Sequence, residues 1–143
     1  MASSQGRTLA HSVFATPAGD LAVIAEGVVV VSTSFRGMDD AMARLDASMA
    51  LGSDWRVGPG SLAAIGAVLA RYTQGDLDAL EEVEVSQPGG SFRQRAWAAM
   101  RGIRAGAVDT YAGLAARAGS PGAYRAAGTA CSTNLVAPFV PSH

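Results

Sequence analysis

The chain has 143 residues, of which 49% are hydrophobic and 16% are charged, and its formal net charge is −1. This length fits one compact domain or two small ones, and so large an apolar fraction argues against intrinsic disorder. No apolar run approaches the roughly 20 residues of a membrane-spanning helix, and no secretory signal opens the sequence, so we expect neither a membrane protein nor a secreted one.

The first part of the chain predicts a β-meander. Apolar residues lie on both sides of the turn signal at residues 16–19, and another apolar run at residues 28–31 follows Gly27. β-Branched residues separated by short turns are typical of neighbouring antiparallel strands. Asp39 and Asp40 then predict the cap of a helix. The apolar face of that helix would carry Met42, Leu45 and Met49.

A second helix and a short strand are expected before residue 90. The apolar positions of this helix recur at helical spacing: Leu62, Ile65, Leu69 and Tyr72. Ser61 is predicted to cap the helix and Gly75 to end it. Val83 and Val85 alternate with acids, which favours an edge strand. Residues 88–90, with the sequence Pro-Gly-Gly, are typical of a linker.

All eleven basic residues are arginine, and they are unevenly distributed. Residues 1–90 hold five arginines and eleven acids, a balance of −6, whereas residues 91–143 hold six arginines and one acid, a balance of +5. We therefore expect an N-terminal α/β support domain in residues 1–90 and a second domain in residues 91–143. A basic domain is what a phosphate-binding surface requires. The alternative is a solvated surface whose arginines face the acidic half.

The second half predicts three helices. The first has one apolar stripe, made of Phe92, Ala96, Trp97 and Met100. Thr110 is expected to cap the next helix, and Gly119 to end it. The stripe of that helix is Tyr111, Leu114, Ala115 and Ala118. Ser120 as N-cap and Pro121 as first residue predict the third helix. Two short helices joined by a tight turn form the helix-turn-helix pattern, whose second helix enters a DNA groove.

The third helix would carry Tyr124 and Arg125, followed by the small residues 126–130. Small side chains allow a helix to approach a partner closely, and they equally allow it to pack closely on the preceding helix. Cys131 is the only cysteine, and the two histidines, His11 and His143, lie at opposite ends of the chain. This set offers neither an internal disulfide nor a metal-ligand cluster, which suits a cytoplasmic protein without a metal.

Several ordered motifs resemble one known family. They are Phe-Arg-Gln-Arg-Ala-Trp at residues 92–97, Gly-Ala-Val-Asp-Thr-Tyr at residues 106–111, Arg-Ala-Ala-Gly-Thr-Ala at residues 125–130, Asn134, and Pro-Ser-His at residues 141–143. In this order and spacing they are similar to the methylated-DNA–protein-cysteine methyltransferases, or O6-alkylguanine-DNA alkyltransferases. The first half adds a Thr-Pro-x-Gly turn and a Tyr-x-x-Gly-Asp-Leu segment, so the resemblance covers essentially the whole chain.

The resemblance implies both a fold and a partner. The fold would be a small ribonuclease-H-like α/β domain with a β-meander, followed by a winged-helix or helix-turn-helix domain. The partner would be double-stranded DNA containing O6-alkylguanine, read from the minor groove with the damaged nucleotide flipped out. No cofactor is implied. Two rivals stay open: a non-enzymatic sensor that recruits other repair factors, and a generic helix-turn-helix transcription module.

The same resemblance suggests roles for individual residues. Arg125 matches the arginine finger that fills the gap in the base stack, and Tyr111 matches a tyrosine that presses on the target phosphate. Ala126, Ala127 and Gly128 would let the helix lie close to the groove floor, and Asn134 matches a hinge before the active-site loop. The plainer alternatives are a phosphate contact or ion pair for Arg125, a core position for Tyr111, and a structural turn for Asn134.

Ser142 occupies the position of the family's alkyl-accepting cysteine, and His143 that of the histidine that activates it. A serine hydroxyl is a poor nucleophile toward an alkyl carbon, so we expect this chain to be inactive in alkyl transfer. The serine is either native or a substitution. Family members continue beyond this histidine, so we expect the C-terminal segment to be missing or to come from a separate chain. Cys131 is interpreted as a buried small hydrophobe, with a surrogate acceptor as the minor alternative.

Overall fold

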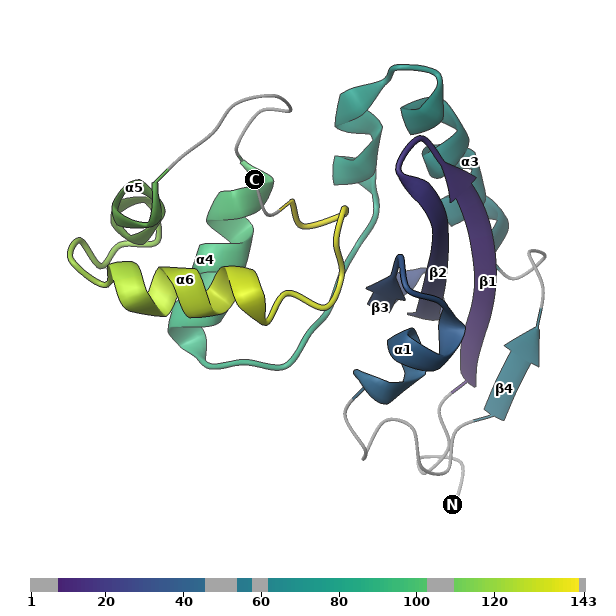
Figure 1. Ribbon diagram of the computed structural model, residues 1–143, viewed down its shortest axis with the longest axis horizontal. Helices are drawn as coiled ribbons and strands as arrows, with labels where there is room; N and C mark the ends of the chain where they lie inside the picture. The colour runs from purple at the N-terminus through teal and green to yellow at the C-terminus, as the bar shows by residue number, and fades with distance from the viewer. Residues whose placement is uncertain (1–7, 46–53, 58–61, 103–109, 142–143) are drawn as a thin grey trace. The chain divides into compact units, whose positions relative to one another are not determined.

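The structure of the protein, a computed structural model, describes residues 8–45, 54–57, 62–102 and 110–141 (Figure 1). The chain divides into two compact units, Met1–Ser86 and Gln87–His143. This division lies a few residues before the expected boundary at Gly90. Each unit has its own core, so the two are described separately.

The N-terminal unit contains a four-stranded sheet with the order β3-β2-β1-β4. Its strands are β1 (Thr8–Thr16), β2 (Gly19–Glu26), β3 (Val29–Ser34) and β4 (Asp54–Val57). The first three strands are antiparallel, which confirms the predicted meander, and β4 pairs in parallel with β1. Gly19 and Gly27 make the two hairpin turns at φ of 120° and 62°, where a side chain would be strained. The sequence did not predict β4.

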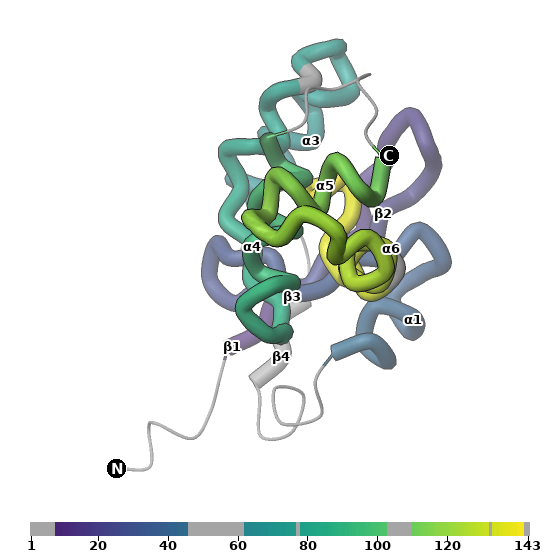
Figure 2. The backbone as a smooth tube through the Cα atoms, turned by 90° about the vertical axis from the view of Figure 1, so that its left-hand side faces the viewer, coloured from purple at the N-terminus to yellow at the C-terminus, as the bar shows by residue number. Residues whose placement is uncertain are grey.

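Two helices cover this sheet on opposite faces (Figure 1 and Figure 2). They are α1 (Met38–Ala43), which contacts β2 and β3, and α3 (Ala63–Thr73), which contacts β1. Five consecutive residues of β2, from Leu21 to Ala25, are buried. Because side chains alternate between the faces of a strand, continuous burial requires a cover on both sides of the sheet.

The helix ends differ in part from the sequence predictions. Gly37, and not Asp39 or Asp40, is the N-cap of α1, and both acids lie in its first turn. The prediction of an aspartate cap was therefore wrong, since the Asp40 carboxylate instead accepts a hydrogen bond from the Ser34 hydroxyl at the end of β3. Gly75 ends α3 as predicted, with a φ of 105°. Met49 and Ser61 lie outside the described residues.

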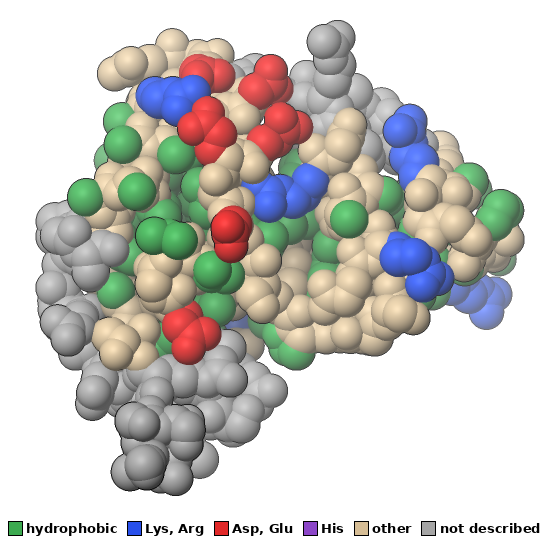
Figure 3. All heavy atoms as spheres, turned by 180° about the vertical axis from the view of Figure 1, so that it is seen from behind, with side chains coloured by type: hydrophobic (Ala, Val, Ile, Leu, Met, Phe, Trp, Pro, Cys, Tyr) green, Lys and Arg blue, Asp and Glu red, His purple; other side chains and the backbone are tan. Residues whose placement is uncertain are grey.

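The segment after α3 forms a 3₁₀ helix, η3 (Leu77–Glu82), and then one isolated parallel bridge. In this bridge Val85 pairs with Val30, and the Ser86 amide donates to the Val30 carbonyl over 2.9 Å. The predicted edge strand at Val83 and Val85 is therefore reduced to a single pairing at the edge of β3. Acidic side chains gather on the surface of this unit (Figure 3).

An ion-pair network joins α3 to η3. The Arg71 guanidinium lies 2.7 Å from carboxylate oxygens of both Asp76 and Glu82. The hydrogen bonds from Arg71 lower the pKa of the Glu82 carboxyl, and the same bonds raise the pKa of Arg71. These side chains are exposed, so the network holds the turn after α3 in place and adds little stability.

The C-terminal unit consists of three packed helices, α4 (Ser91–Arg101), α5 (Tyr111–Arg117) and α6 (Tyr124–Ser132). Their core combines residues of the predicted stripes of α4 and α5 with small residues of α6 and with the segment after it: Ala96, Trp97, Met100, Leu114, Ala115, Ala118, Ala127, Ala130, Val136, Phe139 and Val140. The Trp97 indole donates to the Ala130 carbonyl over 2.8 Å and so ties α4 to α6. In the described part of the chain, no helix is long and apolar enough to cross a membrane.

The turn between α5 and α6 differs from the prediction. Gly119 ends α5 with a φ of 86°, as expected, but α6 starts at Tyr124 with Ala123 as N-cap. The prediction that Ser120 and Pro121 open this helix was wrong. The reason is Gly122, whose φ of 95° is incompatible with helix and keeps the residues before it in the turn.

Candidate nucleic-acid interface

The N-terminus of α5 presents a tyrosine at the surface. Thr110 is its N-cap, as predicted, and the threonine hydroxyl accepts a hydrogen bond from the Gly113 amide over 2.9 Å. This cap leaves Tyr111, the first helical residue, with 55% of its surface exposed. The alternative that Tyr111 faces the core is therefore wrong.

The second helix of the motif, α6, has two distinct sides. Ala127 and Ala130 are fully buried, so the small residues do provide close packing against the neighbouring helices. Tyr124, Arg125 and Ala126 are exposed on the other side. Since Ala127 has no exposed surface, any contribution that it makes to binding acts through the packing that positions α6.

Gly128 lies where α6 and Tyr111 meet. A Cβ atom added at Gly128 would lie 3.3 Å from the Tyr111 ring, which is a tight contact for an aliphatic carbon. A glycine here therefore leaves room for the Tyr111 ring to lie close to the helix. This packing fixes the distance between the exposed tyrosine of α5 and the exposed side of α6.

Arg125 is the exposed cation of α6. Its guanidinium carbon lies 6.0 Å from the ring centroid of Tyr124, at the range of a cation–π contact. The described residues of the C-terminal unit contain five arginines and no aspartate or glutamate, so none of them offers Arg125 an ion pair within this unit. Arginines stand out on the surface of this unit, in contrast to the acidic N-terminal one (Figure 3).

Not every arginine of the unit is available to a ligand. Arg95 donates to the Ala118 carbonyl at the end of α5 over 2.8 Å, and its guanidinium lies over the Phe92 ring. A cation at the C-terminus of a helix can donate a hydrogen bond to a free carbonyl and interacts favourably with the helix dipole. Arg95 therefore has a structural role, which distinguishes it from Arg125.

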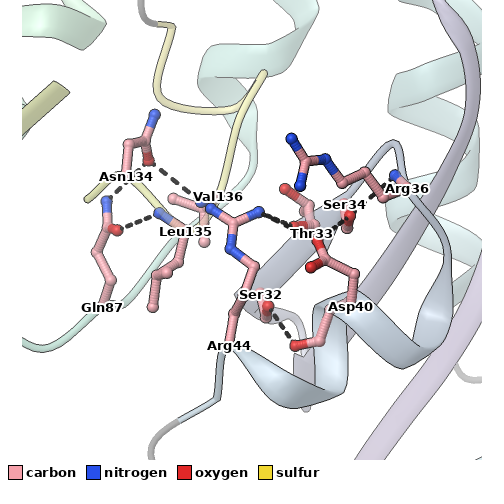
Figure 4. Close-up of polar contacts among 11 residues, drawn as sticks. Ser32, Thr33, Ser34, Arg36, Asp40, Arg44, Gln87, Asn134, Leu135 and Val136 are labelled. Atoms are coloured by element: carbon pink, nitrogen blue, oxygen red, sulfur yellow. Dashed lines mark hydrogen bonds and ion pairs between the residues drawn. The ribbon is translucent and has the colours of Figure 1, made fainter. Parts of the chain in front are cut away.

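Asn134 is the centre of a buried hydrogen-bond network after α6 (Figure 4). Its side-chain oxygen accepts from the Val136 amide over 3.1 Å and from the Gln87 side chain over 3.2 Å, and its amide nitrogen donates to the Val140 carbonyl. The Gln87 side-chain oxygen accepts in turn from the Leu135 amide over 2.8 Å. Asn134 thus holds the segment that leads to Pro141.

Sequence reasoning missed Gln87. This side chain is 6% exposed, and its partners lie 47 and 48 residues further along the chain. The available signal was weak, a glutamine just before the Pro-Gly-Gly segment, and no local pattern connects it to Asn134. Gln94 on α4 adds a bond of 2.7 Å to the Gln87 carbonyl, which fixes the start of the unit.

The positions expected to carry the chemistry are only partly described. Ser142 and His143 lie outside the described residues. Cys131 is half-buried, and burial raises the pKa of its thiol, which disfavours the thiolate. In the ranges that the structure describes, no group of three or more histidine, cysteine, aspartate or glutamate side chains could hold a metal ion.

Comparison with known proteins defines the class. Residues 91–143 match the family model of the DNA-binding domain of 6-O-methylguanine DNA methyltransferase. The chain is 40% identical over 75 residues to a methylated-DNA–protein-cysteine methyltransferase of Salmonella typhimurium, covering 52% of this chain and 44% of the relative. With a protein of the same name from Mycobacterium bovis it is 36% identical over 89 residues, covering 62% and 53% of the two chains. The chain thus spans about half the length of these relatives.

Solved structures show the same fold. A crystal structure of a Mycobacterium tuberculosis O6-methylguanine methyltransferase variant superimposes with a TM-score of 0.72 at 27% identity, over 94% of this chain and 76% of that one. The M. tuberculosis OGT in complex with DNA gives a TM-score of 0.70 at 28% identity over the same shares. These likenesses confirm the predicted fold class, an α/β unit followed by a helical DNA-binding domain. Residues 91–143 thus match the DNA-binding domain of the 6-O-methylguanine DNA methyltransferases, and the chain as a whole is similar to these proteins in sequence and fold.

Proposed function

We propose that this protein is a DNA repair protein that binds double-stranded DNA containing O6-alkylguanine through α5, the following turn and α6. In this proposal α6 lies in the groove, and Arg125 fills the gap that the flipped nucleotide leaves. Tyr111 contacts the phosphate of that nucleotide and favours its rotation out of the stack. The observation that carries the proposal is the exposed Arg125 in a unit whose described residues have no carboxylate. The relative solved with DNA supports the choice of partner.

The packing of α6 suits a close approach to DNA. Ala126 on the exposed side is small and uncharged, so the helix backbone can come near the groove floor. Ala127 and Gly128 are small, so α6 packs closely on its neighbours and on the Tyr111 ring. In the same proposal Asn134 acts as the hinge after the helix, and its hydrogen bonds to residues 136 and 140 support this role.

A comparison of two arginines tests the role of Arg125. Arg125→Ala should weaken binding to a duplex with one O6-methylguanine more than binding to the unmodified duplex, because the finger acts only when a base is flipped. Arg117→Ala, an exposed arginine of α5, is the matched control and should affect both duplexes equally. Fluorescence of 2-aminopurine placed opposite the lesion would report flipping. Equal losses on both duplexes for Arg125→Ala would argue against a finger.

We further propose that this chain does not accept the alkyl group, because Ser142 stands at the acceptor position. Transfer requires a nucleophile that attacks the alkyl carbon while guanine leaves, and a neutral hydroxyl attacks far more slowly than a thiolate. The mass of the intact chain after incubation with an O6-methylguanine duplex should therefore not change. A methyl adduct on Ser142 would refute this part of the proposal. Ser142→Cys is the matched variant for restoring transfer.

The alternative function is a sensor that binds alkylated DNA and recruits other repair factors. The observation that favours it is the combination of an intact recognition helix with serine at position 142. A sensor should protect the lesion from an active alkyltransferase added later. A transcription module would instead bind one sequence without preference for the alkyl group. A cytoplasmic location and a separate chain supplying a C-terminal segment stay predictions.

A further inference from the structure

An exposed aromatic residue on α6 has no role in the core or in the proposed function. Tyr124 is the first residue of α6, and 50% of its surface is exposed. It lies one turn before the fully buried Ala127, but its own side chain is exposed together with Arg125 and Ala126. Half of this side chain is open to solvent, so its ring is available for contact with another group.

The side chain that Tyr124 contacts is Arg125. Consecutive residues on a helix point in different directions, so this contact requires the long arginine side chain to bend back over the ring. The guanidinium carbon then lies 6.0 Å from the ring centroid. A planar cation over an aromatic face is held in one region of space, and its other face stays open.

A second exposed ring, from α5, lies against the same helix. Tyr111 of α5 packs on Gly128, and Gly128 is three residues after Arg125, so both positions share one side of α6. The arginine is thus flanked along the helix by two tyrosine rings that are each about half exposed. Aromatic and guanidinium planes beside each other are the groups on which unstacked nucleobases stack.

We propose that Tyr124 is a further DNA-recognition residue, which holds the Arg125 guanidinium in place and stacks on a nucleobase exposed when the neighbouring nucleotide leaves the helix. This inference rests on the proposed function, in which Arg125 enters the base stack. The ring restricts the arginine before DNA binds, so less side-chain freedom is lost on insertion. The base that loses its neighbour regains a stacking surface on the ring.

The test uses the full chain, four single variants and one double variant. Tyr124→Phe keeps the ring face, whereas Tyr124→Leu removes it at similar bulk. Phe35→Leu, at an exposed aromatic residue of the N-terminal unit, is the matched control. Arg125→Ala completes a double-mutant cycle with Tyr124→Leu. Affinities for a duplex with one O6-methylguanine and for the unmodified duplex are measured by fluorescence anisotropy, with thermal unfolding as a check of folding.

We expect Tyr124→Leu to weaken binding to the O6-methylguanine duplex by about fivefold, and Tyr124→Phe by less than about twofold. Tyr124→Leu should reduce the affinity clearly less in the Arg125→Ala background than in the unsubstituted chain. Unchanged affinity for Tyr124→Leu, additive effects in the cycle, or equal losses for phenylalanine and leucine would overturn the inference. So would a loss of the same size for Phe35→Leu.

The preference for alkylated DNA and the role of Tyr124 can fail separately. If the unsubstituted chain binds both duplexes equally, the proposed preference for O6-alkylguanine is wrong, yet coupling between Tyr124 and Arg125 on unmodified DNA would still support their joint role. If it prefers the alkylated duplex while Tyr124→Leu changes nothing, the proposed function stands and this inference does not. Absence of any DNA binding overturns both.

Discussion

The hydrogen bonds of Gln87 and Asn134 determine where the chain goes after α6. Both side chains are almost fully buried, and each uses its amide oxygen to accept from the backbone of residues 135–136. A buried amide is stable only when its donors and acceptors are paired, and no buried side-chain polar atom among the described residues lacks a partner. The pair therefore specifies one path for the segment that approaches the acceptor position.

Removal of this pair should destabilise the C-terminal unit. Gln87→Ala removes the hydrogen bonds that Gln87 makes with the Asn134 side chain and the Leu135 amide, and their loss should lower the free energy of unfolding by about 2 kcal/mol. Urea unfolding followed by the fluorescence of Trp97, with Trp55 replaced by phenylalanine, would measure this. Gln74→Ala, at an exposed glutamine that ends α3, is the control and should stay within about 0.5 kcal/mol. Equal effects of the two substitutions would contradict the structural role of Gln87.

Cys131 should behave as an inert thiol. Burial raises its pKa, so at any pH below that value a smaller fraction is thiolate than for a free cysteine. The rate of alkylation by iodoacetamide should therefore rise with pH through a midpoint above that of the same chain unfolded in urea. A native midpoint below the unfolded one would indicate an activated cysteine and would revive the surrogate acceptor.

At the scale of elements, helix ends and turns position the recognition helix. Thr110 starts α5, Gly119 ends it, and Gly122 delays α6 until Tyr124. The two positive φ angles bring the chain round within a few residues, so α6 packs on α5 through Ala127. A change in this turn would shift Tyr124 and Arg125 together relative to Tyr111.

The Thr110 cap gives a direct test at this scale. Thr110→Ala removes the side-chain acceptor of the Gly113 amide and should lower the free energy of unfolding by about 1 kcal/mol. Thr110→Ser keeps the hydroxyl and should retain most of that stability. Urea unfolding monitored by circular dichroism compares the two variants. A serine variant as unstable as the alanine variant would show that the hydroxyl does not cap α5.

Local sequence patterns predicted most of the helices and strands, but not the contacts between residues far apart in the chain. The meander, the cap at Thr110 and the stop at Gly75 follow from residue types that act on their own neighbours. The start of α6 was mispredicted, because the Ser-Pro pair resembles a helix start and only the conformation of Gly122 prevents it. β4 and the Gln87–Asn134 pair depend on partners far along the chain, so no short-range pattern could predict them.

At the scale of the whole molecule, the net charge of −1 conceals two opposed parts. The balance is −6 in residues 1–90 and +5 in residues 91–143, so the excess of basic charge lies in the part of the chain that contains α5 and α6. Phosphate contacts release counterions, and binding should accordingly weaken as salt rises. The proposed function joins this electrostatic binding to a site that selects an alkylated base and lacks a cysteine to accept its alkyl group.

The affinity ratio for two duplexes of identical sequence, one with a single O6-methylguanine and one without, tests this claim most directly. It should be measured at equilibrium with the full chain, at more than one salt concentration, because salt changes the shared electrostatic part and not the selection of the base. We predict that the alkylated duplex binds at least about tenfold more tightly at each salt concentration, a difference of about 1.4 kcal/mol. Equal affinity for the two duplexes would contradict the account.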